Sequence, residues 1–285
     1  MFLLIKNNKI NKIIIIILLK INNLNCIAYT KGPGLKGALF IGISLAKTLS
    51  LLLKIPSIGI NHLEAHILIN FAFDSNFKFP SLVLLISGAH TIMLKMTKYH
   101  VFKIIGESAD DGVGESFDKV ARSLKLIPAN GVSIEKKMPY KFIYKNMQFL
   151  KNKKNIKHYN FSFSGIKSEI LKIQNKYAEI NSKNIIYNFQ NTITNTFISK
   201  IRTLLLIDHT FKNIILGGGV SANKELRIAI KNISEEFHIT FRTLPKKYCT
   251  DNGSMVAFLG FIKMNNGFFD NTLNITAFPT LRLLL

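Results

Sequence analysis

The sequence predicts an α/β fold, and three features of the chain support this. Short runs of Ile, Leu and Val with the character of strands alternate with longer segments in which apolar residues keep helical spacing. Glycines mark the junctions, most clearly in Gly32-Pro-Gly-Leu-Lys-Gly37 and Gly217-Gly-Gly219. The chain has 285 residues, of which 48% are hydrophobic, so it can bury one large core or two modest lobes. In such folds, binding sites lie at the ends of the strands.

The first third of the chain should contain two helices and two strands. The apolar run at 13–19 predicts a buried helix over 9–21, because a membrane span needs about 20 apolar residues. A strand over 27–30 leads through the first glycine turn into a helix over 38–53, which Pro56 terminates. A short strand over 57–61 follows.

The remaining expected elements have the same alternating character. Two strands flank a turn at Ser87-Gly-Ala-His-Thr91, polar residues over 155–160 indicate a loop, and three later segments keep helical spacing or begin with a capping residue. We expect strands over 81–86, 92–96 and 214–216, and helices within 110–126, over 185–207 and over 221–231.

Two histidines lie four residues apart in Ile60-Asn-His-Leu-Glu-Ala-His-Ile67. Positions i and i+4 share one helical face, so His62 and His66 could bind one metal ion, although two histidines at this spacing are also common on solvated helices. A zinc protease would need Glu directly after the first histidine, where this chain has Leu63. The pattern permits a metal site and disfavours a metalloprotease.

The composition indicates which binding partners and which cellular compartment to expect. The chain has 38 Lys and Arg against 16 Asp and Glu, a formal net charge of +22. This charge suits a phosphate-rich partner, but Lys is abundant everywhere, so a coding bias remains an alternative. The two cysteines, Cys26 and Cys249, cannot form a disulfide framework, which favours a reducing cytoplasm. The apolar run at 13–19 is too short for a membrane span, and we expect no membrane partner.

The glycine loops alone do not define a nucleotide-binding class. Both loops satisfy the loose dinucleotide pattern, but the strand after the first loop ends in Asn61-His62 without the required acidic residue, and no complete βαβαβ unit follows the second loop. The phosphate-binding P-loop pattern does not occur. The remaining inference is that backbone N–H groups in these loops can approach a phosphate or a sugar closely, and simple tight turns explain the loops equally well.

Seven motifs in order nevertheless resemble one family, the tRNA N(6)-adenosine threonylcarbamoyltransferases. The motifs are Ala28-Tyr-Thr-Lys-Gly-Pro-Gly34, Asn61-His-Leu-Glu-Ala-His66, Leu85-Ile-Ser-Gly-Ala-His-Thr91, Gly106-Glu-Ser-Ala-Asp-Asp111 with Gly114-Glu-Ser-Phe-Asp-Lys119, Phe161-Ser-Phe-Ser-Gly-Ile-Lys167, Gly217-Gly-Gly-Val-Ser-Ala-Asn223 and Cys249-Thr-Asp-Asn252. The resemblance implies the two-lobed actin-like ATPase (sugar kinase/Hsp70) superfold. By the same resemblance, 1–83 with 252–285 would form the N-terminal lobe and 84–251 the C-terminal lobe.

The resemblance also implies the reaction and the metal. The enzyme would transfer threonylcarbamoyl from threonylcarbamoyl-AMP to the exocyclic amine of the adenosine 3′ of the anticodon in tRNA. His62, His66 and Asp251 would bind one divalent metal ion, iron or alternatively zinc. The partners would be tRNA, the adenylate and subunits of a threonylcarbamoylation complex that includes a paralogue with a related fold.

The same family pattern assigns residues to the adenylate. The substrate-binding set would be Leu85, Ile86, Ser87, Gly88, Ala89, Asp118, Gly131, Glu135 and Asn223. The loop from Leu85 to Ala89 would contact the acyl-adenylate, and the other residues would hold its ribose and base. No general base can be named from the sequence.

The chain departs from the family pattern in three places. Ala89 stands where the family has a second glycine, and Asn130-Gly131-Val132 replaces Gly-Gly-Pro. The N-terminal strand and the Thr/Ser/Asp-rich turn of the family have no counterpart before Gly32, so we expect the first lobe to be incomplete. Two other functions therefore compete with the transferase: a truncated, non-catalytic paralogue that binds partner subunits, and, less favoured, a sugar or acetate kinase.

Overall fold

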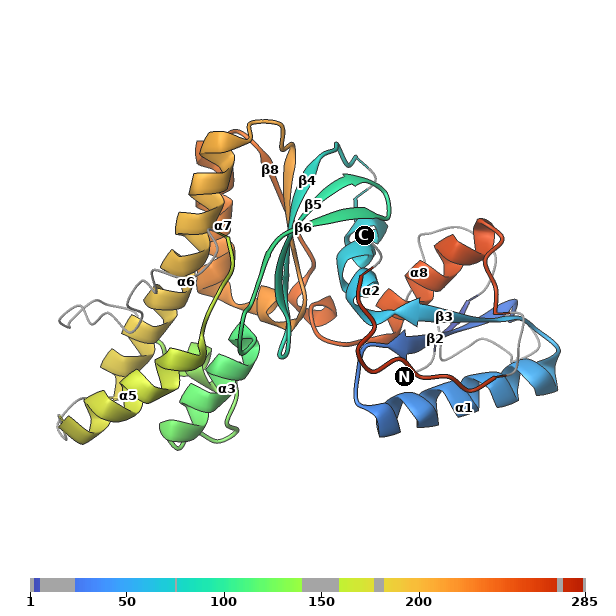
Figure 1. Cartoon of the computed structure of the whole chain (residues 1–285), viewed down its shortest axis with the longest axis horizontal. Helices are drawn as coiled ribbons and strands as arrows, with labels where there is room; N and C mark the ends of the chain where they lie inside the picture. Colours follow the sequence, from blue (N-terminus) through green and yellow to red (C-terminus); the bar gives the residue numbers. More distant parts are fainter. Residues whose placement is uncertain are drawn as a thin grey trace. The chain divides into compact units, whose positions relative to one another are not determined.

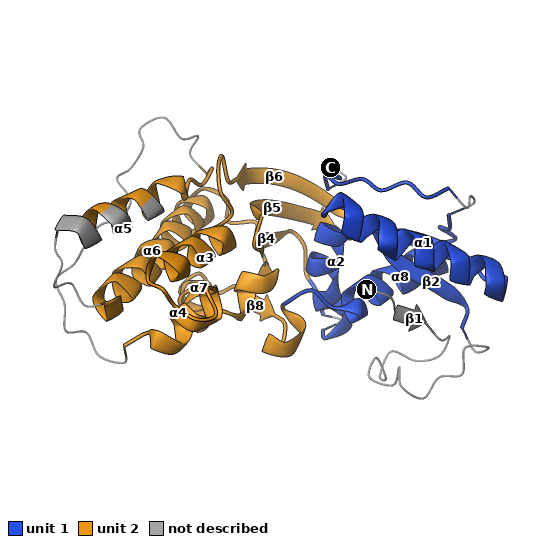
Figure 2. Cartoon of the chain, turned by 90° about the horizontal axis from the view of Figure 1, so that it is seen from below, with its two compact units in different colours: residues 1–77, 250–285 blue, residues 78–249 orange. Residues whose placement is uncertain are grey.

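The computed structural model describes residues 3–5, 24–74, 76–139, 159–176, 182–270 and 274–283. The chain divides into two compact units, residues 1–77 with 250–285 and residues 78–249 (Figure 2). These boundaries correct the predicted ones at 83/84 and 251/252. The strand at 81–86 belongs to the second unit because it pairs there on both sides, and Asp251 belongs to the first unit with the two histidines.

The first unit is a small sheet with a helix on each face (Figure 1). Its elements are β1 (Leu3–Ile5), β2 (Cys26–Gly32), α1 (Lys36–Leu53), β3 (Ser57–Asn61), α2 (His62–Leu68), η2 (Ile69–Ala72) and α8 (Gly253–Asn265). The sheet order is β1-β2-β3, with β1 antiparallel and β3 parallel to β2. Helix α1 covers one face and α8 the other, so β2 lies in the centre of this unit.

Helix α1 packs against β2 through one side only. Its residues Leu39, Ile43 and Ala46 contact Ile27 and Tyr29 of the strand in a small apolar core. The helix is long and apolar enough to cross a membrane by length and composition, and 28% of that stretch is buried. Helix α1 has this composition because it is apolar on two sides, one buried against β2 and the other exposed.

A buried polar cluster joins the segment after α8 to this sheet. Lys47 of α1, 4% exposed, donates to Ser57 Oγ over 3.1 Å and to Asp270 Oδ2 over 3.2 Å. The Tyr29 hydroxyl donates to the same carboxylate, and burial together with this hydrogen bond raises the pKa of Tyr29 well above its ordinary value. Because a buried charge is costly unless it is paired, these contacts hold Asp270 against β3.

The second unit is built on a five-stranded sheet in the order β6-β5-β4-β7-β8. Its strands are β4 (Ser81–Ile86), β5 (Thr91–Lys98), β6 (Val101–Glu107), β7 (Asn213–Gly217) and β8 (Thr240–Thr243). Its helices are α3 (Val113–Ser123), α4 (Gly131–Lys137), α5 (Ser164–Lys176), α6 (Ser182–Ile207), η3 (Gly219–Ala222), α7 (Lys224–Glu236) and η4 (Lys246–Tyr248). Strands β4, β7 and β8 run parallel, and β5 and β6 are antiparallel.

The core of this unit lies between the sheet and the helices α3, α5, α6 and α7, which lie on one side of it (Figure 1). Alternate residues of β4, namely Leu82, Leu84 and Ile86, face this core, as the period of two in a strand requires. Phe189 of α6 contacts Phe117 of α3 edge to face, with ring centroids 4.9 Å apart. The carboxyl ends of β4 and β7 lead into the predicted substrate loop at 85–89 and into the turn before η3.

Most predicted elements are confirmed, with ends shifted by a few residues. The strands over 57–61 and 81–86 match β3 and β4 fully. The helix expected over 221–231 begins later, at Lys224, because Asn223 caps it and a short 3-10 turn precedes it. The helix predicted over 9–21 and most of the loop over 155–160 lie outside the described residues.

Candidate metal centre and adenylate loops

Helix α2 presents both histidines because of where it begins. Strand β3 ends at Asn61, whose side chain accepts hydrogen bonds from Leu63 N over 2.9 Å and from Glu64 N over 3.2 Å. This cap starts the helix at His62, so His62 and His66 occupy the same helical face. Their rings lie edge to face with centroids 4.7 Å apart.

A salt bridge joins α2 to α8, which begins two residues after Asp251. Lys263 Nζ donates to Glu64 Oε2 over 2.8 Å, and Glu64 is 7% exposed. At the start of α8, Asn252 caps the helix by accepting from Met255 N over 3.1 Å. Both contacts fix the position of the third predicted ligand relative to the histidines.

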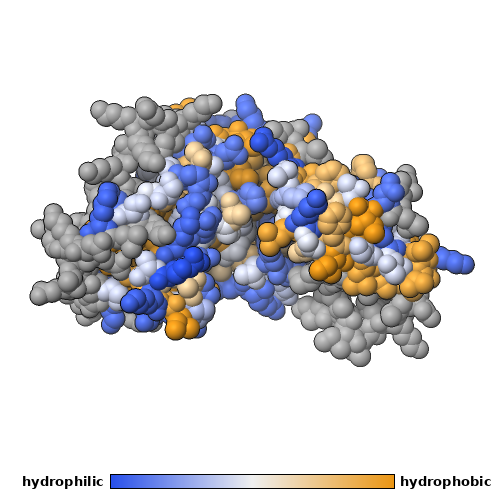
Figure 3. Space-filling view, turned by 60° about the horizontal axis from the view of Figure 1, so that its bottom comes forward, coloured by the Kyte–Doolittle hydropathy of each residue, from blue (hydrophilic) through white to orange (hydrophobic). Residues whose placement is uncertain are grey.

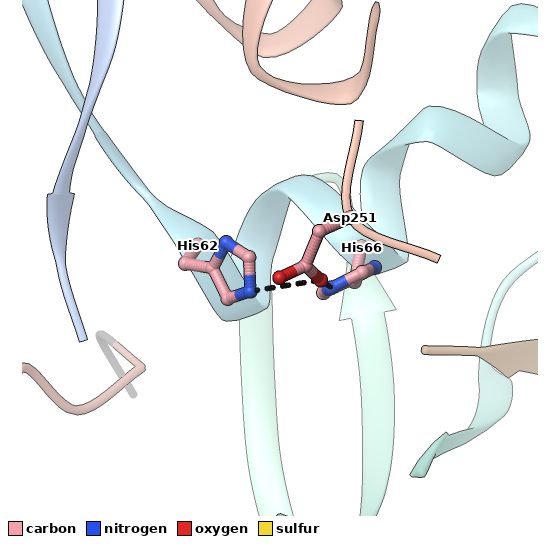
Figure 4. Close-up of side chains that lie close together, drawn as sticks. All are labelled: His62, His66 and Asp251. Atoms are coloured by element: carbon pink, nitrogen blue, oxygen red, sulfur yellow. Dashed lines mark hydrogen bonds and ion pairs between the residues drawn. The ribbon is translucent and has the colours of Figure 1, made fainter. Parts of the chain in front are cut away.

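Asp251 points at the two imidazoles, as Figure 4 shows. Its Oδ1 atom lies 3.0 Å from His66 Nε2 and 3.4 Å from His62 Nε2. The His66 side chain is fully buried, whereas Asp251 is 74% exposed. The three predicted ligands thus converge from two segments of the first unit, with one side open to solvent.

The electrostatics of the triad suit metal binding. Hydrogen bonds with His62 and His66 hold the pKa of Asp251 far below its ordinary value, against the opposing effect of burial. Burial lowers the pKa of His66, although Asp251 partly opposes this. An ionised carboxylate and a neutral imidazole are the protonation states that a metal ion requires of its ligands.

The triad also fits an ion by size and donor type. The candidate ligand atoms of His62, His66 and Asp251 all lie within 4.8 Å of one another. Metal–nitrogen and metal–oxygen bonds are about 2.0–2.2 Å, so ligand atoms on opposite sides of an ion lie about 4.4 Å apart or less, and the three side chains would close up by a few tenths of an ångström to bind one ion. Two imidazoles and one carboxylate are a donor set for a transition metal with open positions. His66 Nδ1 has no hydrogen-bond partner among the described residues.

In the second unit, the loop after β4 lies against three glycines. A Cβ atom added at Gly112, Gly114 or Gly218 would lie 2.5, 2.6 or 2.4 Å from a carbonyl oxygen of Gly88, Ser87 or Ile86, respectively. Glu115 N donates to Gly88 O over 2.9 Å. The predicted loop Leu85–Ala89 is therefore held by the start of α3 and by the turn before η3, and its residues Gly88 and Ala89 are exposed.

The predicted ribose residues come from two adjacent helices. The Asp118 carboxylate on α3 accepts from the backbone of Gly131 at the start of α4, and burial raises the pKa of Asp118. Glu135, one turn further along α4, pairs with Lys246 Nζ at 3.0 Å. Asp118, Gly131 and Glu135 are thus brought together, as a shared site requires.

Asn223 terminates η3, which contacts α3, the helix that carries Asp118. Its side chain caps α7 and is hydrogen bonded to Gln190 of α6. No sequence motif includes Gln190. The available signal was a polar residue between Phe189 and Ile193 on the apolar side of a core helix.

Two further contacts missed by the sequence analysis join the motifs of this unit. Asp110 accepts from Ser162 Oγ over 2.5 Å, Ser164 Oγ over 2.7 Å and Phe163 N over 2.7 Å. Burial alone would raise the pKa of Asp110, but these hydrogen bonds lower it. Two motifs about fifty residues apart in the chain, at 106–111 and 161–167, therefore meet in the folded unit.

Arg227 makes the second contact. Its guanidinium donates to the backbone oxygens of Ser221 and, over 2.6 Å, Leu244, and it lies 2.9 Å from the Cys249 sulfur. It joins the segment after the Gly217-Gly-Gly219 loop to the segment that precedes Asp251. These contacts connect residues that are far apart in the sequence, so the spacing of residues does not reveal them.

Comparison with known proteins identifies the family. The profile described as tRNA N6-adenosine threonylcarbamoyltransferase matches residues 7–258. The chain is similar to the enzyme of that name from Thermosipho melanesiensis, with 40% identity over 93% of this chain and 80% of the relative. It is also similar to the one from Carboxydothermus hydrogenoformans, with 38% identity over 90% of this chain and 76% of the relative.

Solved structures show the same fold. HypF from T. kodakarensis matches with a TM-score of 0.59 and 14% identity over 87% of this chain and 42% of that chain. Full-length HypF in the phosphate- and nucleotide-bound form matches with a TM-score of 0.55 and 14% identity over 77% of this chain and 38% of that chain. The predicted actin-like α/β fold is confirmed. By its sequence, the chain belongs to the tRNA N6-adenosine threonylcarbamoyltransferase family.

Proposed function

We propose that this chain transfers the threonylcarbamoyl group of threonylcarbamoyl-AMP to the exocyclic amine of the adenosine 3′ of the anticodon in tRNA. The observation that carries the proposal is the convergence of His62, His66 and Asp251 in a member of a tRNA N6-adenosine threonylcarbamoyltransferase family. A non-catalytic, partner-binding paralogue would have no use for these three side chains at one exposed position.

The triad would hold one divalent metal ion, iron in the first instance and zinc as the alternative. The ion, when bound, supplies Lewis-acid polarisation of the carbamoyl carbonyl. His66 contributes a buried neutral nitrogen and Asp251 a negative charge. The Glu64–Lys263 salt bridge keeps the helix that carries both histidines in register with α8.

The second unit would bind the adenylate. Carboxylates at Asp118 and Glu135 can accept hydrogen bonds from ribose hydroxyls. The exposed residues Gly88 and Ala89 would offer backbone N–H groups to the acyl phosphate, whereas Ser87 N already donates to His90 O over 2.8 Å, and the glycines packed under this loop keep it in place. Lys246, paired with Glu135, adds a positive charge beside the ribose position.

tRNA and a reducing compartment complete the proposal. The net charge of +22 favours a polyanionic substrate. Cys26 and Cys249 are both free and buried, and burial raises the pKa of Cys26 to about 11, which keeps that thiol protonated. The enzyme would work in the cytoplasm, where such thiols stay reduced.

Nucleoside analysis of tRNA tests the function. Expression of this chain, with its complex partners, in a bacterial strain that lacks its own threonylcarbamoyltransferase should restore threonylcarbamoyladenosine in the tRNA, as measured by mass spectrometry. The Asp251→Ala variant, expressed to the same level, should not restore it. Unmodified tRNA with a folded wild-type chain would exclude the proposed activity.

The exposed side of α1 supports binding to another subunit. Ile41, Leu45 and Leu52 are 75, 45 and 72% exposed and form one helical stripe together with Thr48. Hydrophobic side chains gather over this helix in Figure 3. A largely apolar stripe on a helix suits a helix of a partner protein. We propose that the paralogue with a related fold binds here.

Charged residues on the α1 stripe should disrupt the complex. Ile41→Glu with Leu45→Glu should abolish co-elution with the partner subunit in gel filtration, because two charges would be buried without partners. The melting temperature of the isolated chain should change little, since both residues are exposed. Ile228→Glu, on the exposed side of α7 in the second unit, is the matched control and should leave the complex intact. Unchanged co-elution of the double variant would refute this interface.

A further inference from the structure

Gln190 is a polar residue in the apolar core of the second unit. It lies on α6 between Phe189 and Ile193, both fully buried, and is itself only 2% exposed. Its side chain forms two hydrogen bonds with Asn223, which is 7% exposed. A buried amide in a core helix is costly unless its hydrogen bonds are satisfied, so its partner indicates its role.

The backbone of α7 fixes the orientation of this amide pair. Leu226 N can only donate, and it lies 2.9 Å from Asn223 Oδ1. The oxygen of Asn223 therefore faces the helix, and its Nδ2 donates to Gln190 Oε1 over 2.9 Å. Gln190 Nε2 in turn donates one hydrogen to Asn223 Oδ1 over 3.2 Å and the other to Thr194 Oγ1 over 3.2 Å.

This arrangement leaves Asn223 one hydrogen-bond donor. Its oxygen accepts two hydrogen bonds, which is its capacity, and its nitrogen uses one of two hydrogens. The second hydrogen has no acceptor among the described residues. Because Gln190 and the helix hold the amide on both sides, the side chain cannot turn over. Asn223 thus has one N–H hydrogen, and no oxygen lone pair, left over for a ligand.

We propose that Gln190 is a positioning residue for adenylate binding, which it supports by fixing the amide of Asn223 as a donor to the nucleoside. The inference rests on the proposed function, in which Asn223 holds the ribose or base of the adenylate. Gln190 itself does not touch the ligand. Adenine and ribose offer acceptor atoms that an oriented N–H group can recognise, whereas without Gln190 the amide would be held by Leu226 N alone and could tilt away from the ligand.

Nucleotide affinity tests this role. Gln190→Met keeps the size of the side chain and removes both hydrogen bonds to Asn223. The dissociation constant of AMP, measured by calorimetry on the full chain, should rise about tenfold, the effect of one hydrogen bond. The KM for threonylcarbamoyl-AMP should rise by the same factor and kcat should stay within twofold. Thr194→Val, which removes the other partner of Gln190, should leave AMP affinity unchanged.

A double-mutant cycle separates positioning from general structural damage. If Gln190 acts through Asn223, the AMP affinity of Gln190→Met with Asn223→Ala should equal that of Asn223→Ala alone. Additive losses, or wild-type affinity in Gln190→Met, would overturn the inference while leaving the proposed function intact. If Gln190→Met does not fold, Gln190→Glu, which retains the acceptor oxygen, should still weaken AMP binding at least threefold, and wild-type affinity there would overturn the inference.

A different experimental result would refute the proposed function. A folded wild-type chain that binds neither AMP nor threonylcarbamoyl-AMP would refute the adenylate site itself, and the role of Gln190 with it. If the wild-type chain binds AMP and substitution of Gln190 leaves the affinity unchanged, only the role of Gln190 is refuted.

Discussion

Replacing Asp251 or His66 with alanine should remove the metal ion and the activity together. Either change deletes one of three ligands, and even residues that only support a ligand contribute about 10–100-fold to metal affinity or activity. We therefore expect a loss of roughly 100-fold or more in threonylcarbamoyl transfer. Metal content of the purified chain, measured by mass spectrometry of the elements, should fall from about one ion per chain to a background level.

Two comparisons make this prediction specific. His209→Ala changes an exposed histidine of the second unit and should leave metal content and activity unchanged. Asp251→Asn keeps the shape of the side chain but removes the charge that the two histidines stabilise, so it should also lose the ion. A metal-free wild-type protein with full activity, or an Asp251→Ala protein that retains one ion, would contradict the assignment.

The spacing of residues predicted only part of this site. His62 and His66 were recognisable because a single helix brings them together. Asp251 lies 185 residues from His66, so it came from the resemblance to the family and not from any pattern within the chain. Its position is set by the Asn252 cap and by the salt bridge between Glu64 and Lys263, neither of which a local pattern reveals.

The fold was predictable where burial is continuous. Strand β4 is buried along its whole length and reads as an uninterrupted apolar run from Leu82 to Ile86. The edge strand β8 is partly exposed and short, and the Thr-Phe-Arg-Thr243 sequence gives no clear alternation, so it was missed. Helix α8 was also missed because its own apolar residues occur on every side of the helix and show no helical period.

The polar contacts of the second unit were the least predictable. Gln190 and Asn223 are 33 residues apart, and Asp110 and Ser162 are 52 apart. Hydrogen bonding depends on the tertiary arrangement of helices, which propensity and period do not specify. The glycines showed a conformational requirement at the sequence level, but only the structure distinguishes those that a side chain would disrupt from those with open space around them.

Gly218 and Gly219 provide that distinction within one turn. Gly218 has φ of +87°, in the region that favours glycine, and an added Cβ would lie 2.4 Å from the Ile86 carbonyl oxygen. Gly219, the next residue, has no heavy atom within 4 Å of an added Cβ. The same substitution at adjacent positions should therefore have very different effects.

Gly218→Ala should destabilise the second unit and weaken adenylate binding. A positive φ with an extended ψ, which is essentially confined to glycine, costs about 1–3 kcal/mol for a residue with a side chain, and overpacking costs about 1–3 kcal/mol, so the free energy of unfolding should fall by about 2–6 kcal/mol. Gly219→Ala should change it by less than about 0.5 kcal/mol. Urea denaturation of both variants measures the difference.

The consequence for function follows from the position of Ile86. To accommodate a methyl group at Gly218, the end of β4 must move, and this strand continues directly into the loop Ser87–Ala89. AMP affinity should therefore fall in Gly218→Ala even at a temperature where the protein is fully folded, and it should stay at the wild-type value in Gly219→Ala. Equal stability and equal AMP affinity of the two variants would show that the turn before η3 can move away from β4, and that the loop does not depend on this close approach.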